Sequence, residues 1–273
     1  MKQEMFAGEG DIQLFLRSWR PAGSPRAVVV IVHGFKAHSG LYDWPAERLV
    51  EQGYAVHALD LRGHGKSEGD RQYVDKFTDY VADVHKLVLL AKARDPGRPV
   101  FMLAHSAGGV IACEYALEHQ AELAGLICES FAHEVPAPDF ALAILKGISY
   151  IAPHAHVLNL KNVDYSRDPA FVERLDNDPL IDQTGYPAHT VAEMVRADER
   201  LKQDFPRITL PVLILHGTAD QVTKPHGSVR FYETGGSVDK TLKLYEGHVH
   251  DLLNDHDREV VMADIVGWLA KRG

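Results

Sequence analysis

Runs of consecutive apolar residues recur along the chain, and stretches with helical spacing separate most of them. Residues 27–32 read Ala-Val-Val-Val-Ile-Val, and a β-branched run without polar positions is typical of a strand that is covered on both faces. Comparable runs occupy residues 54–59, 100–104, 126–128, 212–215 and 242–245, and helical patterns occupy residues 75–93, 110–119 and 259–269. Strands that alternate with helices predict the α/β fold class, with a mostly parallel sheet and helices on both faces.

The first residues follow a different pattern, in which apolar positions alternate with their neighbours. Ile12, Leu14 and Leu16 have period-two spacing, which is typical of a half-buried strand. The preceding Gly8-Glu9-Gly10-Asp11 is a turn sequence. The pattern predicts a β-hairpin over residues 3–19.

One interval is too long for a simple strand–helix–strand unit. Roughly 80 residues separate the run at Cys128 from the run at Val212, whereas about 30 suffice for such a unit. The surplus, residues 132–200, contains an apolar helical stretch at 140–151, turns rich in Pro and Asp, and a second helix near 190–202. Insertions after strand ends in α/β sheets usually build the site, so we predict a mainly helical cap; an extra core helix is the alternative.

Composition narrows the class of protein. The length of 273 residues suits one large α/β domain, and the net charge of −9 without a basic run argues against nucleic acid and against adhesion to an anionic membrane. Cys113 and Cys128 lie in apolar stretches and are predicted to be core residues rather than a disulfide. No run reaches the ~18 apolar residues of a membrane span, and the N-terminus has no signal-peptide core, so we expect a cytoplasmic protein.

The segment Leu103-Ala104-His105-Ser106-Ala107-Gly108-Gly109 follows a predicted strand and precedes a predicted helix. A serine at the apex of such a turn, with small residues two places before and after it, is the pattern of an exposed nucleophile. The usual first glycine is Ala104 here, and only a very small side chain fits that position. The alternative is a serine that merely caps the helix.

A serine hydroxyl needs a base, and the base needs an orienting carboxylate. In this architecture the chain order is serine, acid, histidine. Asp220 follows the run at 212–215, and His248 and His250 follow the run at 242–245. All three loops leave the same sheet edge as Ser106, so the side chains can converge.

Other polar residues are given structural roles. Asp60 also ends a strand, but the glycines Gly63 and Gly65 that follow indicate that it organises a turn. The histidines at strand ends and in turns are predicted to be hydrogen-bonded structural residues, namely His33, His64, His105 and His216. The His-x-His pairs at 154–156 and 248–250 resemble metal-ligand spacing, but such pairs arise by chance among 16 histidines, and no metal is predicted.

Taken together, these motifs resemble the monoacylglycerol lipase family of α/β-hydrolases, a group that includes lysophospholipase-like and serine aminopeptidase-like hydrolases. The resemblance covers nearly the whole chain. It rests on His33-Gly34, the serine turn, Asn177-Asp178-Pro179-Leu180, and the segments at 60–69, 217–220 and 240–247. The resemblance implies the α/β-hydrolase fold, with a core of residues 1–131 and 201–273 and a cap of residues 132–200. It also implies that Ser106, Asp220 and His250 form a catalytic triad without a cofactor.

The oxyanion of the tetrahedral intermediate needs two hydrogen-bond donors. One is predicted to be the backbone N–H of Ala107, and the other that of Phe35, which follows His33-Gly34.

Three positions depart from the resemblance. Family members selective for monoacylglycerols tend to carry Glu, Arg and a second His at the positions of Ala37, Leu41 and Leu253, where these groups are thought to hold the glycerol hydroxyls. A pocket without them cannot favour a polyol by hydrogen bonding. The resemblance therefore supports ester hydrolysis more strongly than glycerol recognition.

The predicted function is a serine carboxylic-ester hydrolase for apolar acyl esters, with monoacylglycerols among the candidates. The predicted partners are a small-molecule ester or lipid and, through the cap, transient contact with a lipid surface. An acyltransferase, a thioesterase or a peptidase would use the same triad, and a non-catalytic binding protein on this fold is a further alternative.

Overall fold

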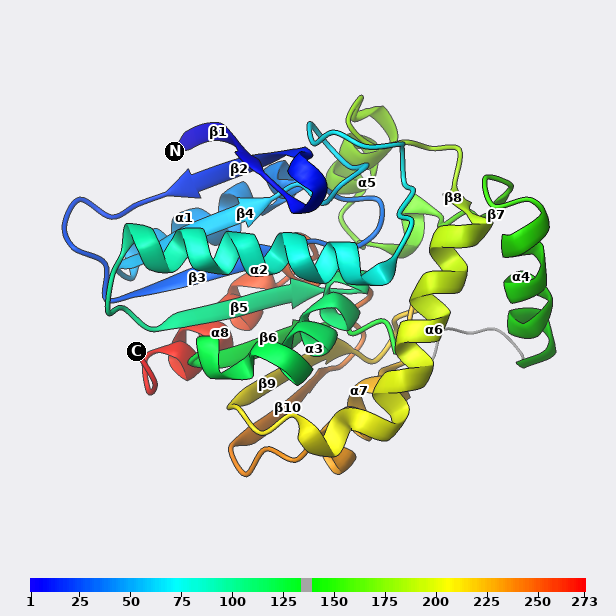
Figure 1. The fold of residues 1–273 in the computed structure, drawn as a ribbon. Helices are drawn as coiled ribbons and strands as arrows, with labels where there is room; N and C mark the ends of the chain where they lie inside the picture. Colours follow the sequence, from blue (N-terminus) through cyan, green and yellow to red (C-terminus); the bar gives the residue numbers. More distant parts are fainter. Residues whose placement is uncertain (134–138) are drawn as a thin grey trace.

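The structure, a computed structural model, describes residues 1–133 and 139–273. In these residues eight strands form one sheet in the order β1-β2-β4-β3-β5-β6-β9-β10 (Figure 1). Its members are β1 (Lys2–Ala7), β2 (Gln13–Trp19), β3 (Ala27–Val32), β4 (Tyr54–Leu59), β5 (Val100–His105), β6 (Gly125–Glu129), β9 (Val212–Gly217) and β10 (Lys240–Tyr245). All neighbours from β4 to β10 are parallel, while β1 and β2 form the predicted antiparallel hairpin. The predicted fold class is confirmed.

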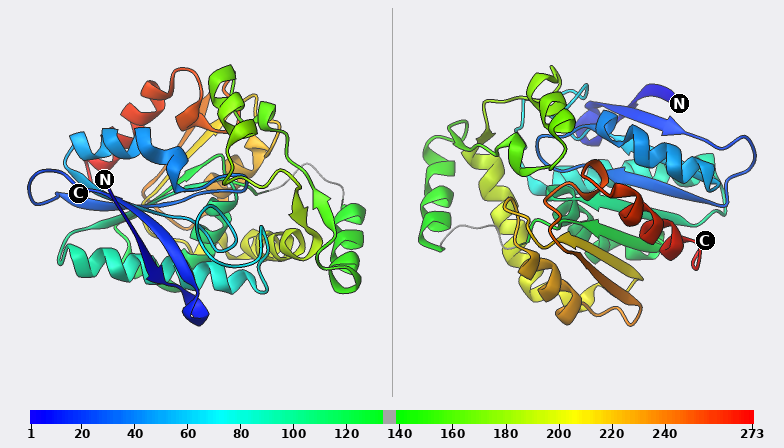
Figure 2. Two further views of the ribbon diagram at one scale, coloured as in Figure 1. Left: turned by 90° about the horizontal axis from the view of Figure 1, so that it is seen from above. Right: turned by 180° about the vertical axis from the view of Figure 1, so that it is seen from behind.

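Helices cover both faces of the sheet. Figure 1 shows α2 (Phe77–Arg94) and α3 (Ala107–His119) in front, and the view from behind in Figure 2 shows α1 (Asp43–Glu51) and α8 (Arg258–Leu269) on the other face. The fully apolar β3 lies at the centre of the sheet and is buried along its whole length. A strand that is covered on both faces has no solvent side, which explains why its sequence does not alternate.

The segment between β6 and β9 lies beyond the carboxyl ends of the parallel strands (Figures 1 and 2). It contains α4 (Asp139–Ile151), β7 (His156–Leu158), α5 (Pro169–Asn177), β8 (Tyr186–Pro187) and α6 (Ala188–Asp204). Both predicted helices form, whereas residues 134–138 of the predicted cap lie outside the described residues. Helix α5 occupies a stretch predicted as turns; the Asp168 side chain accepts from the N–H of Ala170, and Pro169 stands in its first turn.

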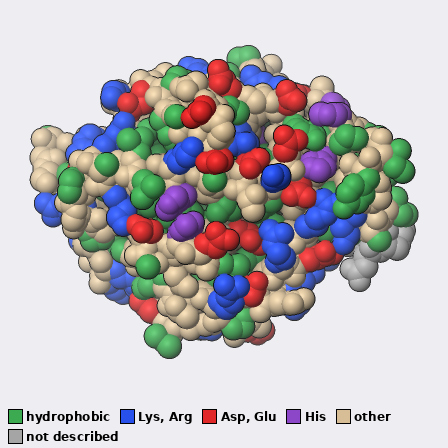
Figure 3. Space-filling model, in the orientation of Figure 1, with side chains coloured by type: hydrophobic (Ala, Val, Ile, Leu, Met, Phe, Trp, Pro, Cys, Tyr) green, Lys and Arg blue, Asp and Glu red, His purple; other side chains and the backbone are tan. Residues whose placement is uncertain are grey.

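The interior agrees with the composition. Cys113 and Cys128 are buried free thiols, as predicted. No helix among the described residues is long and apolar enough to cross a bilayer. The surface mixes acidic and basic side chains, and exposed apolar side chains gather toward the edge where α4 lies (Figure 3). There Ile144, Tyr150 and Ile151 are 58%, 77% and 88% exposed.

Candidate active site

Ser106 stands at the sharp turn between β5 and α3, with φ 55° and ψ −120°. This left-handed conformation is strained for a serine and persists only where the surroundings fix it. Two glycines allow the neighbouring backbone to pack closely enough to fix this conformation. A Cβ on Gly108 would lie 2.4 Å from the carbonyl oxygen of Val32, and one on Gly34 would lie 2.7 Å from Cβ of Ser106. The methyl group of Ala104 fits in the core, where the residue is fully buried.

The three loops predicted to converge do so. Ser106 Oγ lies 2.9 Å from Nε2 of His250, and Nδ1 of His250 lies 2.8 Å from Oδ2 of Asp220. The Tyr165 ring meets the imidazole edge-on, with centroids 5.0 Å apart and an interplanar angle of 86°. These contacts hold His250 between a hydroxyl and a carboxylate.

Asp220 is surrounded by donors. Its Oδ1 accepts from the backbone N–H groups of Val222 and Thr223, at 2.8 and 3.0 Å. Its Oδ2 receives the Thr223 hydroxyl at 2.9 Å and faces Nε2 of His216 at 3.0 Å. Burial by itself would raise the pKa of Asp220, but the charges and hydrogen bonds of His250 and His216 hold the pKa well below its usual range. The carboxylate is therefore ionised at any working pH.

Sequence reasoning missed two of these partners. His216 was predicted to be a satisfied core residue; it is buried, but it also contacts Asp220, and its Nδ1 pairs with Ser228 Oγ at 2.7 Å. Thr223 was not singled out. Its signal was the Asp-x-x-Thr spacing after a strand, which places a hydroxyl beside the carboxylate three residues before it.

The loop after β3 lies against the serine turn. The carbonyl of Phe35 accepts from the Tyr165 hydroxyl at 3.2 Å, and the N–H of Lys36 donates to the Tyr186 hydroxyl at 2.5 Å. The Phe35 and Tyr186 rings stack with centroids 3.8 Å apart. Phe35, Ser106 and Ala107 all line one cavity. Tyrosines of the inserted segment thus hold the peptide that directly follows Phe35, the residue whose N–H is one predicted oxyanion donor.

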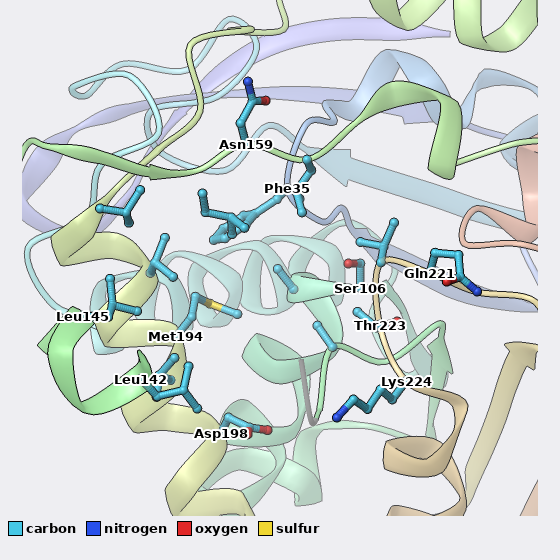
Figure 4. Close-up of a pocket in the computed structure, with 18 of the residues that line it drawn as sticks. Phe35, Ser106, Leu142, Leu145, Asn159, Met194, Asp198, Gln221, Thr223 and Lys224 are labelled. Carbon is cyan, nitrogen blue, oxygen red and sulfur yellow. The ribbon is translucent and has the colours of Figure 1, made fainter. Parts of the chain in front are cut away.

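That cavity has a volume of about 730 Å³. Figure 4 shows Leu142, Leu145 and Met194 facing it across from Ser106, with Asn159 toward one end and Asp198 and Lys224 toward the other. We call six apolar side chains of α4 and α6 the roof: Leu142, Leu145, Ile148, Val191, Met194 and Val195. We call the loops after the carboxyl ends of β3, β4, β5, β6, β9 and β10 the floor; they carry Ser106 and its partners.

The competing residues occupy structural positions. Asp60 accepts from the N–H groups of Ser39 at 2.7 Å and Lys66 at 2.8 Å, and so organises its turn as predicted. His33 donates to the carbonyl of Gly34 at 2.7 Å and accepts from the N–H of Leu61 at 2.9 Å.

His105 packs against the His250 ring, with centroids 4.8 Å apart, and its Nε2 faces the backbone carbonyl of His250. Burial lowers the pKa of His33 and of His105 well below the ordinary value, and that of His64 to about 4. His248 lies on the same loop as His250, but its Nδ1 is 3.9 Å from Asp255.

One group of potential metal ligands exists among the described residues. Single ligand atoms of His105, Glu129 and Asp251 lie within 4.8 Å of one another, and all three residues are buried. The His-x-His pairs that the sequence suggested do not belong to this group.

Comparison with known proteins gives one consistent result. The chain matches the family described as serine aminopeptidase, S33, over residues 23–257. A monoacylglycerol lipase of Mycolicibacterium smegmatis is 31% identical over 270 residues, which cover 98% of this chain and 96% of that protein. The monoglyceride lipase of Homo sapiens is 34% identical over 265 residues, which cover 95% and 87%.

Solved structures agree. The monoacylglycerol lipase of Paleococcus ferrophilus has a TM-score of 0.85 at 31% identity and covers 95% of this chain and 99% of that one. A thermostable carboxyl esterase from Bacillus coagulans, in complex with glycerol, has a TM-score of 0.88 at 25% identity and covers 99% and 98%.

Proposed function

Since the chain belongs to the serine aminopeptidase, S33, family and is a serine ester hydrolase of the α/β-hydrolase fold, we propose that Ser106 is its nucleophile, His250 its general base and Asp220 the orienting carboxylate. The family resemblance predicted from the motifs is confirmed. The observation that carries the residue assignment is the row of contacts at 2.9 and 2.8 Å that joins Ser106 Oγ, the His250 ring and Asp220 Oδ2.

The chemistry follows from this row. His250 Nε2 takes the Ser106 proton as Oγ attacks the acyl carbonyl, and Asp220 holds the imidazole with Nδ1–H toward itself. The carbonyl oxygen becomes negative and accepts from the N–H groups of Phe35 and Ala107, each worth roughly 3–4 kcal/mol by comparison with other enzymes. His250 then protonates the departing alcohol. Water, activated by the same imidazole, releases the acid and frees Ser106.

We further propose that residues 132–200 are a lid on a core made by residues 1–131 and 201–273. The roof supports this, because its side chains close the cavity over Ser106. The end of α6 also belongs to the core, since Ala197 and Leu201 join the main hydrophobic cluster. Helix α6 therefore serves both as the cap helix and as the core helix that the sequence left as alternatives.

The substrate class follows from the cavity. Apolar side chains dominate the wall above Ser106, so the acyl group is an apolar chain. The names of the relatives place monoacylglycerols among the candidate substrates. Ala37, Leu41 and Leu253 are buried in an apolar cluster and offer no hydrogen bond to a glycerol hydroxyl. We therefore propose an esterase for apolar acyl chains without strong selection for glycerol as the leaving group.

The exposed face of α4 supports one further part of the proposal. Tyr150 and Ile151 are 77% and 88% exposed at the end of α4, the helix that also supplies Leu142, Leu145 and Ile148 to the roof. Apolar and aromatic side chains at such a position partition into the interfacial region of a lipid phase. Transient contact there would bring the lid to a substrate that resides in lipid.

The test is the removal of the nucleophile. Ser106→Ala should lower kcat for p-nitrophenyl butyrate by at least about 10⁴-fold while the thermal unfolding midpoint changes little. A fluorophosphonate should label the wild-type protein and not the variant. Ser24→Ala, at an exposed loop position, is the matched control and should behave as wild type. Retained turnover in Ser106→Ala would refute the assignment.

A further inference from the structure

The end of β6 touches the loops of all three triad residues. The backbone carbonyl of Glu129 accepts from the N–H of Ser106 at 2.9 Å. Its side-chain Oε1 accepts from the N–H of Leu253, three residues after His250, at 3.1 Å. Strand β6 lies between β5 and β9, so this position faces the serine turn on one side and the acid loop on the other.

The next residue, Ser130, contacts the loop that carries Asp220. Ser130 has a φ of 46°, a conformation that non-glycine residues rarely adopt. In this conformation its carbonyl lies 3.2 Å from the Thr223 hydroxyl, which in turn contacts Asp220. Two consecutive residues at one strand end thus contact the loops of nucleophile, base and acid.

We propose that Glu129 is a positioning residue that sets the distance between Ser106 and His250, its main chain fixing the serine turn and its side chain fixing the histidine loop. The proposal rests on the triad assigned above. A glutamate here is not explained by core packing, because the residue is 0% exposed and a buried carboxyl without a positional role would be costly.

The side chain of Glu129 is surrounded by other titratable groups. Burial and the neighbouring Asp251 raise the pKa of Glu129 well above its usual range. Burial also raises the pKa of Asp251 to about 6. The titratable groups that face Glu129 are Asp251 from the loop after β10, Tyr245 at the end of β10, Tyr42 beside α1 and His105 at the end of β5. A glutamine side chain has the length of this carboxyl and keeps an oxygen that can accept from the N–H of Leu253.

A second side chain holds the same loop. His105, the register partner of Glu129 on β5, donates from Nε2 to the carbonyl of His250 at 3.4 Å. Oε2 of Glu129 has no hydrogen-bond partner among the described residues, so Oε1 makes the link to the histidine loop, where the backbone N–H groups of Leu253 and Leu252 lie against the carboxyl. Neither Glu129 nor Leu253 is among the residues that line the cavity, so a change at this link tests positioning of the triad rather than binding of the acyl chain.

The experiment compares Glu129→Gln with Glu129→Ala on p-nitrophenyl butyrate. Glutamine keeps the acceptor for Leu253 and should retain kcat within about 3-fold. Alanine releases the loop and should lower kcat by about 10- to 100-fold, since a misplacement of about 1 Å can cost 10²-fold, while KM stays within about 2-fold. The rate of fluorophosphonate labelling should fall by the same factor as kcat. Glu118→Ala, exposed on α3, is the control.

Other outcomes are decisive as well. Glu129→Asp keeps the acid but is one methylene shorter, so it should resemble alanine rather than glutamine. Equal losses in the glutamine and alanine variants, or a change confined to KM, would overturn the proposal. If neither alanine nor aspartate folds while glutamine does, Glu129 supports the fold rather than the site, and the proposal also fails. The triad assignment fails separately, through retained turnover in Ser106→Ala.

Discussion

The floor and the roof of the cavity are held by different kinds of interaction. In the floor, the side chains of Ser106, His250 and Asp220 have defined partners at hydrogen-bond distance, as in the contacts of 2.8 and 2.9 Å that His250 makes with Asp220 and Ser106. In the roof, apolar side chains such as Leu145 and Met194 face the cavity without a directional partner. Hydrogen bonds depend steeply on distance and angle, whereas apolar contact does not. Single atoms should therefore matter in the floor, and shape and volume in the roof.

The difference assigns separate tasks to the two regions. The floor is built from strand ends that the sheet fixes, and in our proposal it determines whether an ester is cleaved. The roof comes from the inserted segment, and in our proposal it determines which acyl chain reaches Ser106. Substitutions in the floor should change kcat, and substitutions in the roof should change the ratio of rates between substrates.

Removal of the proposed base, His250, should produce the largest effect. It is the most direct test of the separate roles of floor and roof. His250→Ala should lower kcat for p-nitrophenyl butyrate by at least about 10⁴-fold, because members of a triad act as a unit. His248→Ala, two residues away on the same loop, should lose less than about 3-fold. Steady-state kinetics of the two variants would decide the matter. The reverse ranking would move the base to position 248.

Acidification should lower the free energy of unfolding of the protein, because the floor contains histidines whose burial disfavours the protonated form. Burial lowers the pKa of His64 to about 4, whereas an unfolded histidine has a pKa of about 6.5. Between these values the unfolded chain binds a proton that the folded chain does not, so the free energy of unfolding falls as the pH falls from 6.5 to 4. The contribution of His64 over this range is about 3 kcal/mol, at about 1.36 kcal/mol per pH unit.

Denaturant unfolding at several pH values would measure this effect. His64→Gln should lose less stability on acidification than the wild-type protein, so the two curves of stability against pH converge at low pH or cross. His156→Gln, at an exposed position in β7, is the control, and its curve should run parallel to that of the wild type. If the curve of His64→Gln instead runs parallel to that of the wild type, protonation of His64 does not contribute to the loss of stability on acidification.

The sequence predicted the proposed catalytic side chains of the floor better than the residues that hold their loops in place. Ser106 and Asp220 could be located because each follows a strand-like run and because parallel strands end at one sheet edge, whereas the choice of His250 over His248 came from the family resemblance. Glu129 also ends such a run, but its contact with Ser106 depends on which strands are neighbours, and linear order does not show that. The role of Ser130 depends on a backbone conformation that no pattern of apolar residues signals.

The inserted segment was predictable only in outline. The apolar stretch and the surplus length indicated a helical insertion, and α4 and α6 form there. Tyr165 and Tyr186 could not be connected to His250 and Phe35, because those contacts span long stretches of chain and depend on the path of the inserted segment. The start of helix α5 was indicated locally by Asp168-Pro169, an N-cap residue followed by proline. The stretch was nevertheless predicted as turns because it is rich in Pro and Asp.

A change of volume in the roof has the smallest expected effect and sharpens the comparison most. Met194→Trp places a larger side chain in the wall opposite Ser106, so it should shorten the acyl chain that the cavity accepts. The ratio of kcat/KM for a p-nitrophenyl laurate over a butyrate should fall by about 10-fold, since one methylene in an apolar pocket is worth roughly 1–3 kcal/mol. Met194→Leu conserves volume and should keep the ratio within about 2-fold. Butyrate turnover and fluorophosphonate labelling should stay near wild type in both variants, because no floor contact changes. A loss of butyrate kcat equal to the loss of laurate kcat would mean that the roof also positions the triad, and the separation of the two regions would not hold.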